Sequence, residues 1–398
     1  MSVLRRTRVL AATDTLEVGG AERVAVDIVN SLDRDRHDVF FCATRGDGLL
    51  RDVLLPDVDV GIIGRRATWD VAGMARFAQW VNDRRIDIIH THGRGTMQFV
   101  ALCLRLGLIR TAHVYHDHYG HLHLDRRAPA GLRSALHTVD GFLGVDQRLC
   151  TWAREDVGLP AERIHLVRSG VDLTRFVAVE PIDLRSAFDL PDAEVVLVMV
   201  ANYRRQKDHP TVLRALALLP GDVRRRLGVV TVGSTESESG YFDRCWAMAE
   251  DLGVTDQIRV AGTREDTLRL MAGADAGLLA SKNETGPLVV LEYMASRLPF
   301  VVTDTGEITR AIAGLPIGWT PAPRDPHQLA AALRSLLDAG PRARTAMGER
   351  GRHVAEEMFD QVQVTRQIER IYHHVIIGGT DGATPEPARP IPAARSDR

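Results

Sequence analysis

The chain has 398 residues, of which 45% are hydrophobic and 26% are charged, and its formal net charge is -2. This length exceeds one ordinary hydrophobic core and favours two domains of comparable size. The nearly balanced charge gives no reason to expect nucleic acid as a partner. The scattered cysteines lack the spacing of a zinc site or of a disulfide scaffold, which favours a reducing cytoplasm; they are Cys42, Cys103, Cys150 and Cys245.

The sequence shows no secretory signal and no run of about 18 apolar residues, so we expect a cytoplasmic protein without a membrane span. Basic side chains at Arg5, Arg6 and the Arg126 and Arg127 pair are compatible with peripheral contact at the inner face of the membrane. A solvated charge cluster explains the same residues equally simply.

Short β-rich runs alternate with longer helical segments from one end of the chain almost to the other. This is the pattern of parallel sheets covered on both faces by helices, and it predicts an α/β protein with two doubly wound, Rossmann-like domains. The predicted strands are residues 8–13, 38–44, 58–63, 86–92, 111–116 and 140–145 in the first half, and 194–202, 229–234, 258–262, 276–281 and 299–304 in the second.

The junction between the two domains is predicted near "VRSGVDLTRF", residues 167–176, where a strand-like run ends in a Ser-Gly turn. The predicted domains are therefore 1–172 and 173–358, followed by a helix over 359–377. Residues 378–398 are rich in Gly, Pro and Ala and predict a disordered tail. Two doubly wound domains facing one another create a cleft at the carboxyl ends of their strands, where such sheets bind ligands.

After the first strand, Gly19 and Gly20 precede a helix predicted to start near Ala21. Paired glycines let backbone N–H groups approach an anion at the positive end of the helix, so a phosphate or a sugar could bind there. A tight turn between strand and helix is an equally good interpretation. The absence of G-x-G-x-x-G and of a P-loop disfavours a dinucleotide dehydrogenase or a P-loop enzyme.

Histidines follow the fourth and fifth strands. His90 and His92 end the fourth, and the fifth leads into a run of five, namely His113, His116, His118, His121 and His123. Imidazole is a favoured ligand of zinc and other transition metals, which raises a metal-site hypothesis. No established metalloenzyme spacing is present, and a histidine at a strand end can equally bond sugar hydroxyls or its own loop.

Three cations, Arg204, Arg205 and Lys207, follow the first strand of the second half in "VMVANYRRQKDH". Cations at the carboxyl end of a strand can neutralise the charge that grows on a diphosphate leaving group. A charged loop is also commonly just solvated. The glycine-containing loops after neighbouring strands favour a ligand site.

The stretch "SKNETGPLVVLEYMASRLPFVVTDTGE", residues 281–307, places Glu284 before a predicted helix and Glu292 about a turn and a half into it. Pro287 suits the first turn of this helix, which should run to about Ser296. The positive end of the helix should hold an anion through backbone N–H groups, around Gly286, Pro287, Leu288 and Val289. Glu284 can then accept hydrogen bonds from a sugar, and Glu292 can hold the two hydroxyls of a ribose. An acid at a helix start plus an unrelated surface glutamate is the simpler alternative.

At these residues the chain resembles the retaining glycosyltransferases of the GT-B fold, in the large family four with its E-x7-E motif. Here the motif is Glu284 to Glu292 in "NETGPLVVLE". The resemblance covers roughly residues 8 to 377 and includes "GGAER", "HTHG", "YHDH", "SGVD", "NYRRQKDH" and "PFVVTDTG". It also implies that the helix over 359–377 crosses back to the first domain.

The resemblance implies that Glu292 binds the donor ribose and Glu284 lies against the donor sugar. It implies that Lys207, with Arg204 or Arg205, holds the diphosphate, and that His116 touches the donor sugar. His116, Glu284 and Lys207 are thus the expected catalytic residues.

Three positions depart from the family pattern. Asn202 stands where many relatives carry the arginine that binds the diphosphate. Arg310 stands where an acid often follows the "TG" loop, and Arg297 replaces a common glycine. Asn202 leaves the arginine assignment open, and Arg310 and Arg297 could alter the choice of donor.

The expected activity is transfer of a hexose-like sugar from a UDP- or GDP-sugar to an acceptor hydroxyl with retention, in glycan or glycoconjugate biosynthesis. The first domain should bind the acceptor, a sugar, a lipid-linked compound or a small molecule, and the second domain the donor. No cofactor or metal is expected, because no paired aspartates suggest a magnesium-diphosphate site. The alternatives are a nucleotide-sugar epimerase of the same fold, a metal-dependent hydrolase using the histidines between His113 and His123, and a catalytically silent binding subunit.

Overall fold

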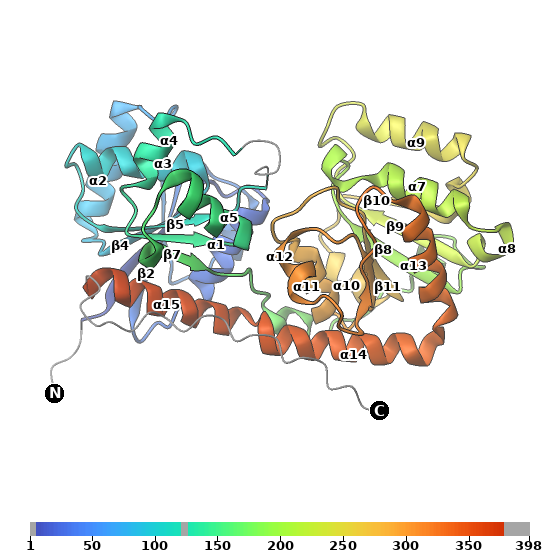
Figure 1. Cartoon of the computed structure of the whole chain (residues 1–398). Helices are drawn as coiled ribbons and strands as arrows, with labels where there is room; N and C mark the ends of the chain where they lie inside the picture. The colour runs from blue at the N-terminus through green and yellow to red at the C-terminus, as the bar shows by residue number, and fades with distance from the viewer. Residues whose placement is uncertain (1–4, 121–125, 378–398) are drawn as a thin grey trace. The chain divides into compact units, whose positions relative to one another are not determined.

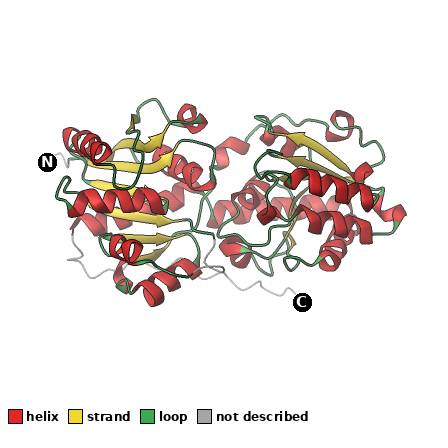
Figure 2. Cartoon of the chain, turned by 90° about the horizontal axis from the view of Figure 1, so that it is seen from above, coloured by secondary structure: helices red, strands yellow, loops and turns green. Residues whose placement is uncertain are grey.

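The computed structural model describes residues 5–120 and 126–377, so the tail predicted over 378–398 lies outside the described residues. The chain divides into two compact units. Unit 1 contains the described residues up to Gly170 together with those from Gln361 onward, and unit 2 runs from Val171 to Asp360. Each unit is a parallel sheet with helices on both of its faces (Figure 1 and Figure 2). The predicted α/β class with two Rossmann-like domains is confirmed.

Unit 1 is built on a seven-stranded sheet with the order β3-β2-β1-β4-β5-β6-β7, in which every pair is parallel. Its strands are β1 (Thr7–Thr15), β2 (His37–Gly46), β3 (Asp59–Ile62), β4 (Ile88–His92), β5 (Ala112–Asp117), β6 (Gly141–Gly144) and β7 (Ile164–Leu166). Its helices are α1 (Gly20–Ser31), α2 (Val71–Asp83), α3 (Arg94–Arg105), α4 (Ala130–Leu136), α5 (Gln147–Trp152) and the last helix of the chain, α15 (Gln361–Ile377).

Unit 2 is built on a six-stranded parallel sheet with the order β10-β9-β8-β11-β12-β13. Its strands are β8 (Val195–Val200), β9 (Leu227–Val232), β10 (Ile258–Gly262), β11 (Ala276–Leu279), β12 (Phe300–Val302) and β13 (Gly318–Trp319). Its helices are α6 (Leu184–Ala187), α7 (His209–Leu218), α8 (Gly221–Arg224), α9 (Tyr241–Asp251), α10 (Thr267–Ala272), α11 (Leu288–Ala295), α12 (Gly306–Ala311), α13 (Pro326–Asp338) and α14 (Gly340–Met358).

Every predicted strand overlaps an observed one, and two observed strands, β7 and β13, were not predicted. β7 has three residues, all only partly buried, and β13 has two. Runs this short carry too few side chains to show a periodic pattern. Both lie at the edge of a sheet, where one strand neighbour is enough to hold them.

In each sheet the strand order reverses once: the first strands are added successively toward one edge of the sheet, and the later strands are added toward the opposite edge. In unit 1 this reversal lies between β1 and β4, and in unit 2 between β8 and β11. The connections that leave the two strands then diverge to opposite sides, which opens a crevice outside their carboxyl ends. The loops after β8 and β11 should therefore carry the ligand-binding groups of unit 2.

Helix α11 is anchored to the centre of the unit 2 sheet by the buried side chain of Tyr293. Its hydroxyl oxygen lies 3.0 Å from the Val198 carbonyl and 2.9 Å from the Leu278 carbonyl, and it accepts a hydrogen bond from the Val200 N–H at 3.2 Å. Gly277 leaves room for the ring, since a Cβ there would come within 2.3 Å of it. The start of α11 is thus fixed relative to β8 and β11.

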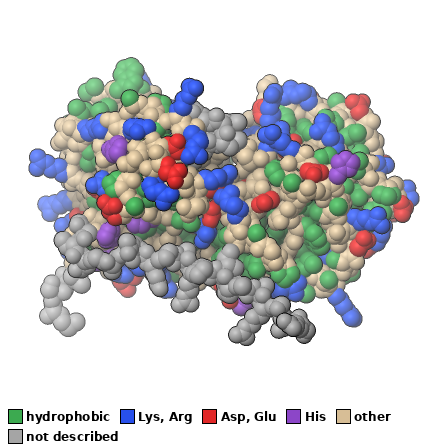
Figure 3. All heavy atoms as spheres, viewed as in Figure 1, with side chains coloured by type: hydrophobic (Ala, Val, Ile, Leu, Met, Phe, Trp, Pro, Cys, Tyr) green, Lys and Arg blue, Asp and Glu red, His purple; other side chains and the backbone are tan. Residues whose placement is uncertain are grey.

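Among the described helices, none combines the length and the hydrophobicity that crossing a bilayer requires. On the face shown in Figure 3, Lys and Arg side chains are interspersed with Asp and Glu on both units, as expected from the nearly balanced charge of the chain.

Helix α11 ends in a left-handed residue that is not glycine. Arg297 has φ +57°, its N–H bonds the Met294 carbonyl at 3.1 Å, and the next N–H, of Leu298, bonds the Tyr293 carbonyl at 2.9 Å. This is a Schellman arrangement, which glycine favours because a Cβ is strained at positive φ. The glycine that the family resemblance leads us to expect at this position would therefore have a conformational reason.

Replacing this arginine by glycine should stabilise the protein. We expect Arg297→Gly to raise the free energy of unfolding by about 0.5–1 kcal/mol, because relief of the left-handed strain exceeds the backbone entropy of glycine. The lost ion pair with Glu349 is exposed and contributes little. Urea unfolding measures the change. The matched control is Arg334→Gly inside α13, which should lose about 1 kcal/mol; equal losses in both variants would contradict the interpretation.

Candidate functional site

The loops that follow β8 and β11 meet in unit 2 because these strands are neighbours in the sheet, with Leu197 opposite Ala276. Lys207 ends a short 3-10 turn after β8, and its Nζ lies 2.6 Å from Oε1 of Glu284, which follows β11. The Ser281 hydroxyl donates to the same carboxylate oxygen at 2.7 Å. The predicted catalytic residues Lys207 and Glu284 are thus brought together.

Further hydrogen bonds tie the two loops to each other. The Gln206 side-chain amide donates to the Asn283 carbonyl at 2.9 Å and lies 3.4 Å from Oε2 of Glu284. The Lys282 N–H donates to the Gln206 carbonyl at 2.8 Å. Sequence reasoning missed Ser281 and Gln206, although both are polar residues in the loops that follow β11 and β8. Together they orient the Glu284 carboxylate, which is only 9% exposed.

A glycine allows the loop after β12 to pack closely against the loop that carries Glu284. Gly306 has φ +87°, and a Cβ there would lie 2.9 Å from the Thr285 carbonyl oxygen. The next N–H, of Glu307, donates to that same carbonyl at 2.7 Å. The buried Glu307 pairs with Arg310 at 3.2 Å, so the arginine that departs from the family pattern interacts with the acid three residues before it.

The helix that carries the second glutamate starts at Leu288, so Pro287 stands immediately before the first turn, for which it was predicted. Pro287 is the residue before α11, and α11 runs from Leu288 to Ala295 without a side-chain cap at its start. The first N–H groups of a helix, here including Leu288 and Val289, have no acceptor within the helix. They and the preceding Gly286 leave a positive helix end beside the loop of Glu284.

Glu292 lies on the accessible edge of an otherwise buried helix. Leu288, Glu292 and Ser296 follow one another at intervals of four residues and are the partly exposed positions, whereas the residues between them are buried. Residues four apart share one face of a helix. Glu292 is therefore placed to meet a ligand or solvent from the same face on which α11 begins.

The two candidate arginines have different surroundings. The Arg205 side chain forms an ion pair with Glu238 at 2.6 Å, and the backbone N–H of Arg205 also donates to that carboxylate at 2.8 Å. Arg204 is exposed and makes no side-chain hydrogen bond or ion pair with the described residues. Asn202 fixes the loop after β9 by accepting the Ser234 N–H at 2.9 Å. Arg204 is thus the guanidinium that a ligand can recruit without breaking a contact.

In unit 1, Gly19 stands before α1 and Gly20 is its first residue, next to the predicted start near Ala21, but an acid is already present there. A Cβ on Gly19 would lie 2.2 Å from Oε2 of Glu22, so this carboxylate folds back over the start of the helix. Burial raises the pKa of Glu22, and the negative charge of Asp14 adds to the shift. A carboxylate at this end of α1 competes with any anion bound there.

The histidines of unit 1 form a buried cluster at the ends of β4 and β5. His90, His92 and His116 are at most 2% exposed. Burial lowers the pKa of His116 to about 4, with an opposing contribution from the Val167 backbone. His113, on the opposite face of β5, bonds the Thr91 hydroxyl at 2.9 Å. His121 and His123 lie outside the described residues.

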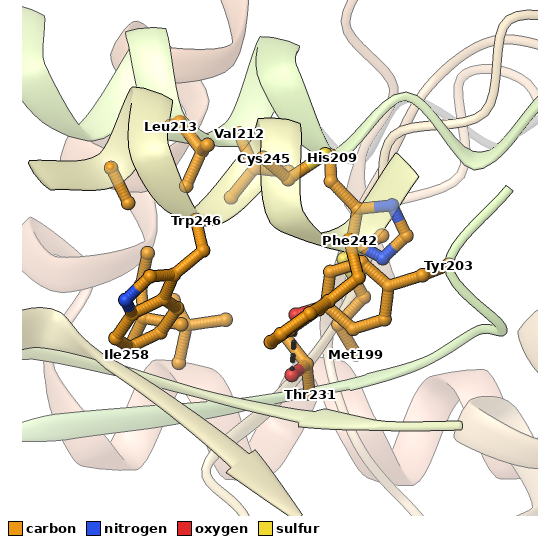
Figure 4. Close-up of a pocket in the computed structure, with 12 residues that line it drawn as sticks. Met199, Tyr203, His209, Val212, Leu213, Thr231, Phe242, Cys245, Trp246 and Ile258 are labelled. Atoms are coloured by element: carbon orange, nitrogen blue, oxygen red, sulfur yellow. Dashed lines mark hydrogen bonds between the residues drawn. The ribbon is translucent and has the colours of Figure 1, made fainter. Parts of the chain in front are cut away.

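Unit 2 also contains an apolar pocket, which lies between the sheet and helices α7 and α9 (Figure 4). Tyr203 bonds the Thr231 hydroxyl at 2.9 Å, and its ring stacks on the His209 imidazole with 4.0 Å between centroids. Burial lowers the pKa of His209 to about 3, with a smaller contribution from the charge of Lys207. The polar groups that could bind a diphosphate do not line this pocket.

Two solved structures share the fold of this chain. Anabaena HepE in complex with UDP and glucose superposes with a TM-score of 0.79 at 19% identity, covering 92% of this chain and all of that one. A glycosyltransferase from Rickettsia africae gives a TM-score of 0.79 at 17% identity, covering 94% of this chain and 99% of that one. The fold of the chain is therefore GT-B, with two Rossmann-like domains.

The sequence matches extend over both units. Residues 182–354 match the family described as "Glycosyl transferases group 1", and residues 18–175 match "Glycosyltransferase Family 4". Together with the fold, these matches show that the chain belongs to the GT-B glycosyltransferases of the family 4 type.

Curated relatives are similar over different lengths. N-acetyl-alpha-D-glucosaminyl L-malate synthase of Bacillus anthracis is 23% identical, over 92% of this chain and 96% of its own. D-inositol 3-phosphate glycosyltransferase of Thermobispora bispora is 26% identical over 77% of each chain. The enzyme of that name from Mycobacterium sp. (strain JLS) is 33% identical, but over 45% of this chain and 40% of its own.

A double-mutant cycle should detect the ion pair that centres the site. With Lys207→Met, Glu284→Gln and the double variant, we expect a coupling free energy of about 1–3 kcal/mol in the unfolding of the ligand-free protein, because the bond is charged and partly buried. Urea denaturation provides the free energies. The control is the exposed pair of Arg226 and Glu194, at 2.7 Å, whose coupling should stay below about 1 kcal/mol. Equal coupling in both pairs would contradict a fixed site.

The buried imidazole of His209 should make stability depend on pH in a known direction. The pKa of His209 is about 3 in the folded protein, below the pKa of a histidine in the unfolded chain. The contribution of His209 to the free energy of unfolding is therefore complete above the unfolded pKa. It is lost as the pH falls below that value, because the unfolded chain then binds a proton that the folded protein does not. Between about pH 7.5 and about pH 5.5, His209→Phe should lose about 1 kcal/mol less stability than the wild type. Chemical denaturation at both pH values tests this. The exposed His327→Phe is the control, and an identical pH response of all three proteins would refute the prediction.

Proposed function

We propose that the protein transfers a hexose-like sugar from a nucleoside-diphosphate sugar to an acceptor hydroxyl, with retention at the anomeric carbon. The observation that carries the proposal is the Lys207–Glu284 pair beside the start of α11. This arrangement offers a cation, an oriented carboxylate and a positive helix end, which suit the diphosphate and the sugar of such a donor. UDP is the preferred nucleotide of the proposal, because HepE, which has the same fold, binds UDP and UDP-glucose.

Each part of the donor has a matching group. The ammonium of Lys207 has three donors and uses one of them on Glu284, so further donors can turn to diphosphate oxygens. Arg204 and the N–H groups at the start of α11 add positive charge. The ribose hydroxyls would bind the carboxylate of Glu292, which accepts hydrogen bonds along the accessible edge of the helix.

The proposed sugar transfer depends on stabilising the diphosphate as it leaves. The bond between the anomeric carbon and the diphosphate oxygen breaks, and the acceptor oxygen bonds the same face of that carbon. The acceptor proton passes to an oxygen of the departing diphosphate, which acts as the base. Lys207 and the helix end stabilise the negative charge that develops on the leaving group. The Glu284 carboxylate already accepts bonds from Lys207 and Ser281, which makes it a weak nucleophile for a double displacement.

The remaining roles divide between the units. Unit 2 would hold the donor, and unit 1 would hold the acceptor, with His116 near the donor sugar as the family resemblance implies. We expect the diphosphate to need no divalent ion, because Lys207 and Arg204 supply the positive charge in its place. A sugar, lipid-linked or small-molecule acceptor fits this scheme equally, with peripheral membrane contact for a lipid-linked one. The transferase family matches favour this scheme over an epimerase.

Calorimetric titration with UDP, GDP and ADP tests the donor site. We expect one nucleotide to bind the wild type with the same affinity with and without EDTA. Glu292→Ala should weaken that binding at least about tenfold, since charged hydrogen bonds to the ribose are worth about 1.5–3 kcal/mol. Glu250→Ala, on the exposed face of α9, is the matched control and should bind like the wild type.

Two results would overturn the proposal. One is absence of binding for all three nucleotides, and the other is binding that Glu292→Ala leaves unchanged. Once an acceptor is found, the anomeric configuration of the product, read by NMR, decides between retention and inversion.

A further inference from the structure

Three imidazoles share one small volume in unit 1. His90 and His92 stand two residues apart on β4 and so face the same side of the sheet, and His116 lies opposite His92 on β5. Their ring centroids are separated by 4.3 Å for His90 and His92, 5.4 Å for His90 and His116, and 5.3 Å for His92 and His116. One nitrogen from each ring lies within 4.8 Å of the nitrogens of the other two.

The outer nitrogens of two of these rings are already engaged. Nδ1 of His90 lies 2.6 Å from the hydroxyl of Tyr372 on α15, and Nδ1 of His92 lies 3.1 Å from Nε2 of His118. With the proton on Nδ1, each ring donates outward and keeps a lone pair on Nε2. Histidines that bind metals are usually oriented in this way by a second partner on the other nitrogen.

Two of the inner nitrogens have no partner in the described part of the chain. Nε2 of His90 and Nε2 of His92 are buried without a hydrogen bond, and the buried His116 ring has the Val167 backbone as a partner for at most one of its two nitrogens. A buried polar atom left unpaired costs about 1–3 kcal/mol, and here at least two belong to one cluster of three rings. A neutral imidazole with its lone pair on the inner nitrogen is the form that binds metals.

We propose that His90, His92 and His116 bind one transition-metal dication, with Zn²⁺ the best-suited ion. Imidazole nitrogens lie about 2.0–2.1 Å from zinc, so three tetrahedral ligands stand about 3.3 Å apart. The His90 and His116 rings stack at an interplanar angle of 13°, so the rings have to turn before nitrogens that now lie within 4.8 Å of one another face one ion at that spacing. Three neutral ligands leave the fourth position to water, and a zinc-bound water that ionises near neutral pH supplies compensating negative charge.

One ligand of this site, His116, is also the residue that the family resemblance places near the donor sugar, but zinc binding itself does not depend on the proposed function. Its ligands come from β4 and β5, and through Tyr372 the ion would also be coupled to α15. The run from His113 to His123, which raised the metal hypothesis in the sequence, supplies one ligand. The other two come from the preceding strand. The ion would thus join the carboxyl ends of two adjacent strands to the last helix.

Zinc binding to the untagged, full-length chain tests the proposal. After dialysis against a chelator, Zn²⁺ is titrated in competition with a chromophoric chelator, and metal content is measured by mass spectrometry. We expect one tightly bound Zn²⁺ per wild-type chain and a higher melting temperature with zinc. His92→Asn and His116→Asn should lose both effects, while His113→Asn, on the opposite face of β5, should keep them. Circular dichroism verifies that each variant is folded.

Tyr372→Phe supplies a variant that keeps all three ligands. Losing the bond to His90 should weaken zinc binding about 10–100-fold, as loss of an outer partner does at other metal sites, without abolishing it. The proposal is overturned if the wild type binds no zinc, which would mean that water alone fills the cluster. It is equally overturned if His92→Asn and His113→Asn take up zinc alike. Nucleotide binding is unaffected by either result, so this test and the donor test fail separately.

Discussion

Parallel pairing of β8 with β11 is the constraint on which the candidate site depends. Some 80 residues separate the two strands in sequence, yet their carboxyl ends lie side by side because β11 adds to the free side of β8. The loops that leave them must then diverge, and polar side chains at both strand ends meet over the crevice. The ammonium of Lys207 reaches the carboxylate of Glu284 for this reason.

The same loops are held in place from several directions. Tyr293 fixes α11 to the centre of the sheet, Gly306 lets the loop after β12 pass close beneath Thr285, and the Gln206 amide joins the loops after β8 and β11. Such support keeps the carboxylate oriented before any ligand arrives, which lowers the reorganisation that binding and reaction require.

Unit 1 uses the ends of its strands differently. Buried imidazoles lie at the ends of β4 and β5, where unit 2 has the ion pair of Lys207 and Glu284, and the start of α1 already carries the carboxylate of Glu22. Two sheets with similar topology thus present different chemistry at equivalent places. The difference lies in the side chains at strand ends, not in the fold that positions them.

The sequence by itself determined the α/β class, all strands except the very short β7 and β13, and the polar residues that follow the strands. These features are local, since periodicity and turn residues are properties of neighbouring positions. Only the tertiary structure decided which of these residues meet. It paired Lys207 with Glu284, held Arg205 on Glu238 while leaving Arg204 exposed, and combined His116 with two histidines of another strand. Strand order and register bring distant residues together, and no spacing along the chain encodes them.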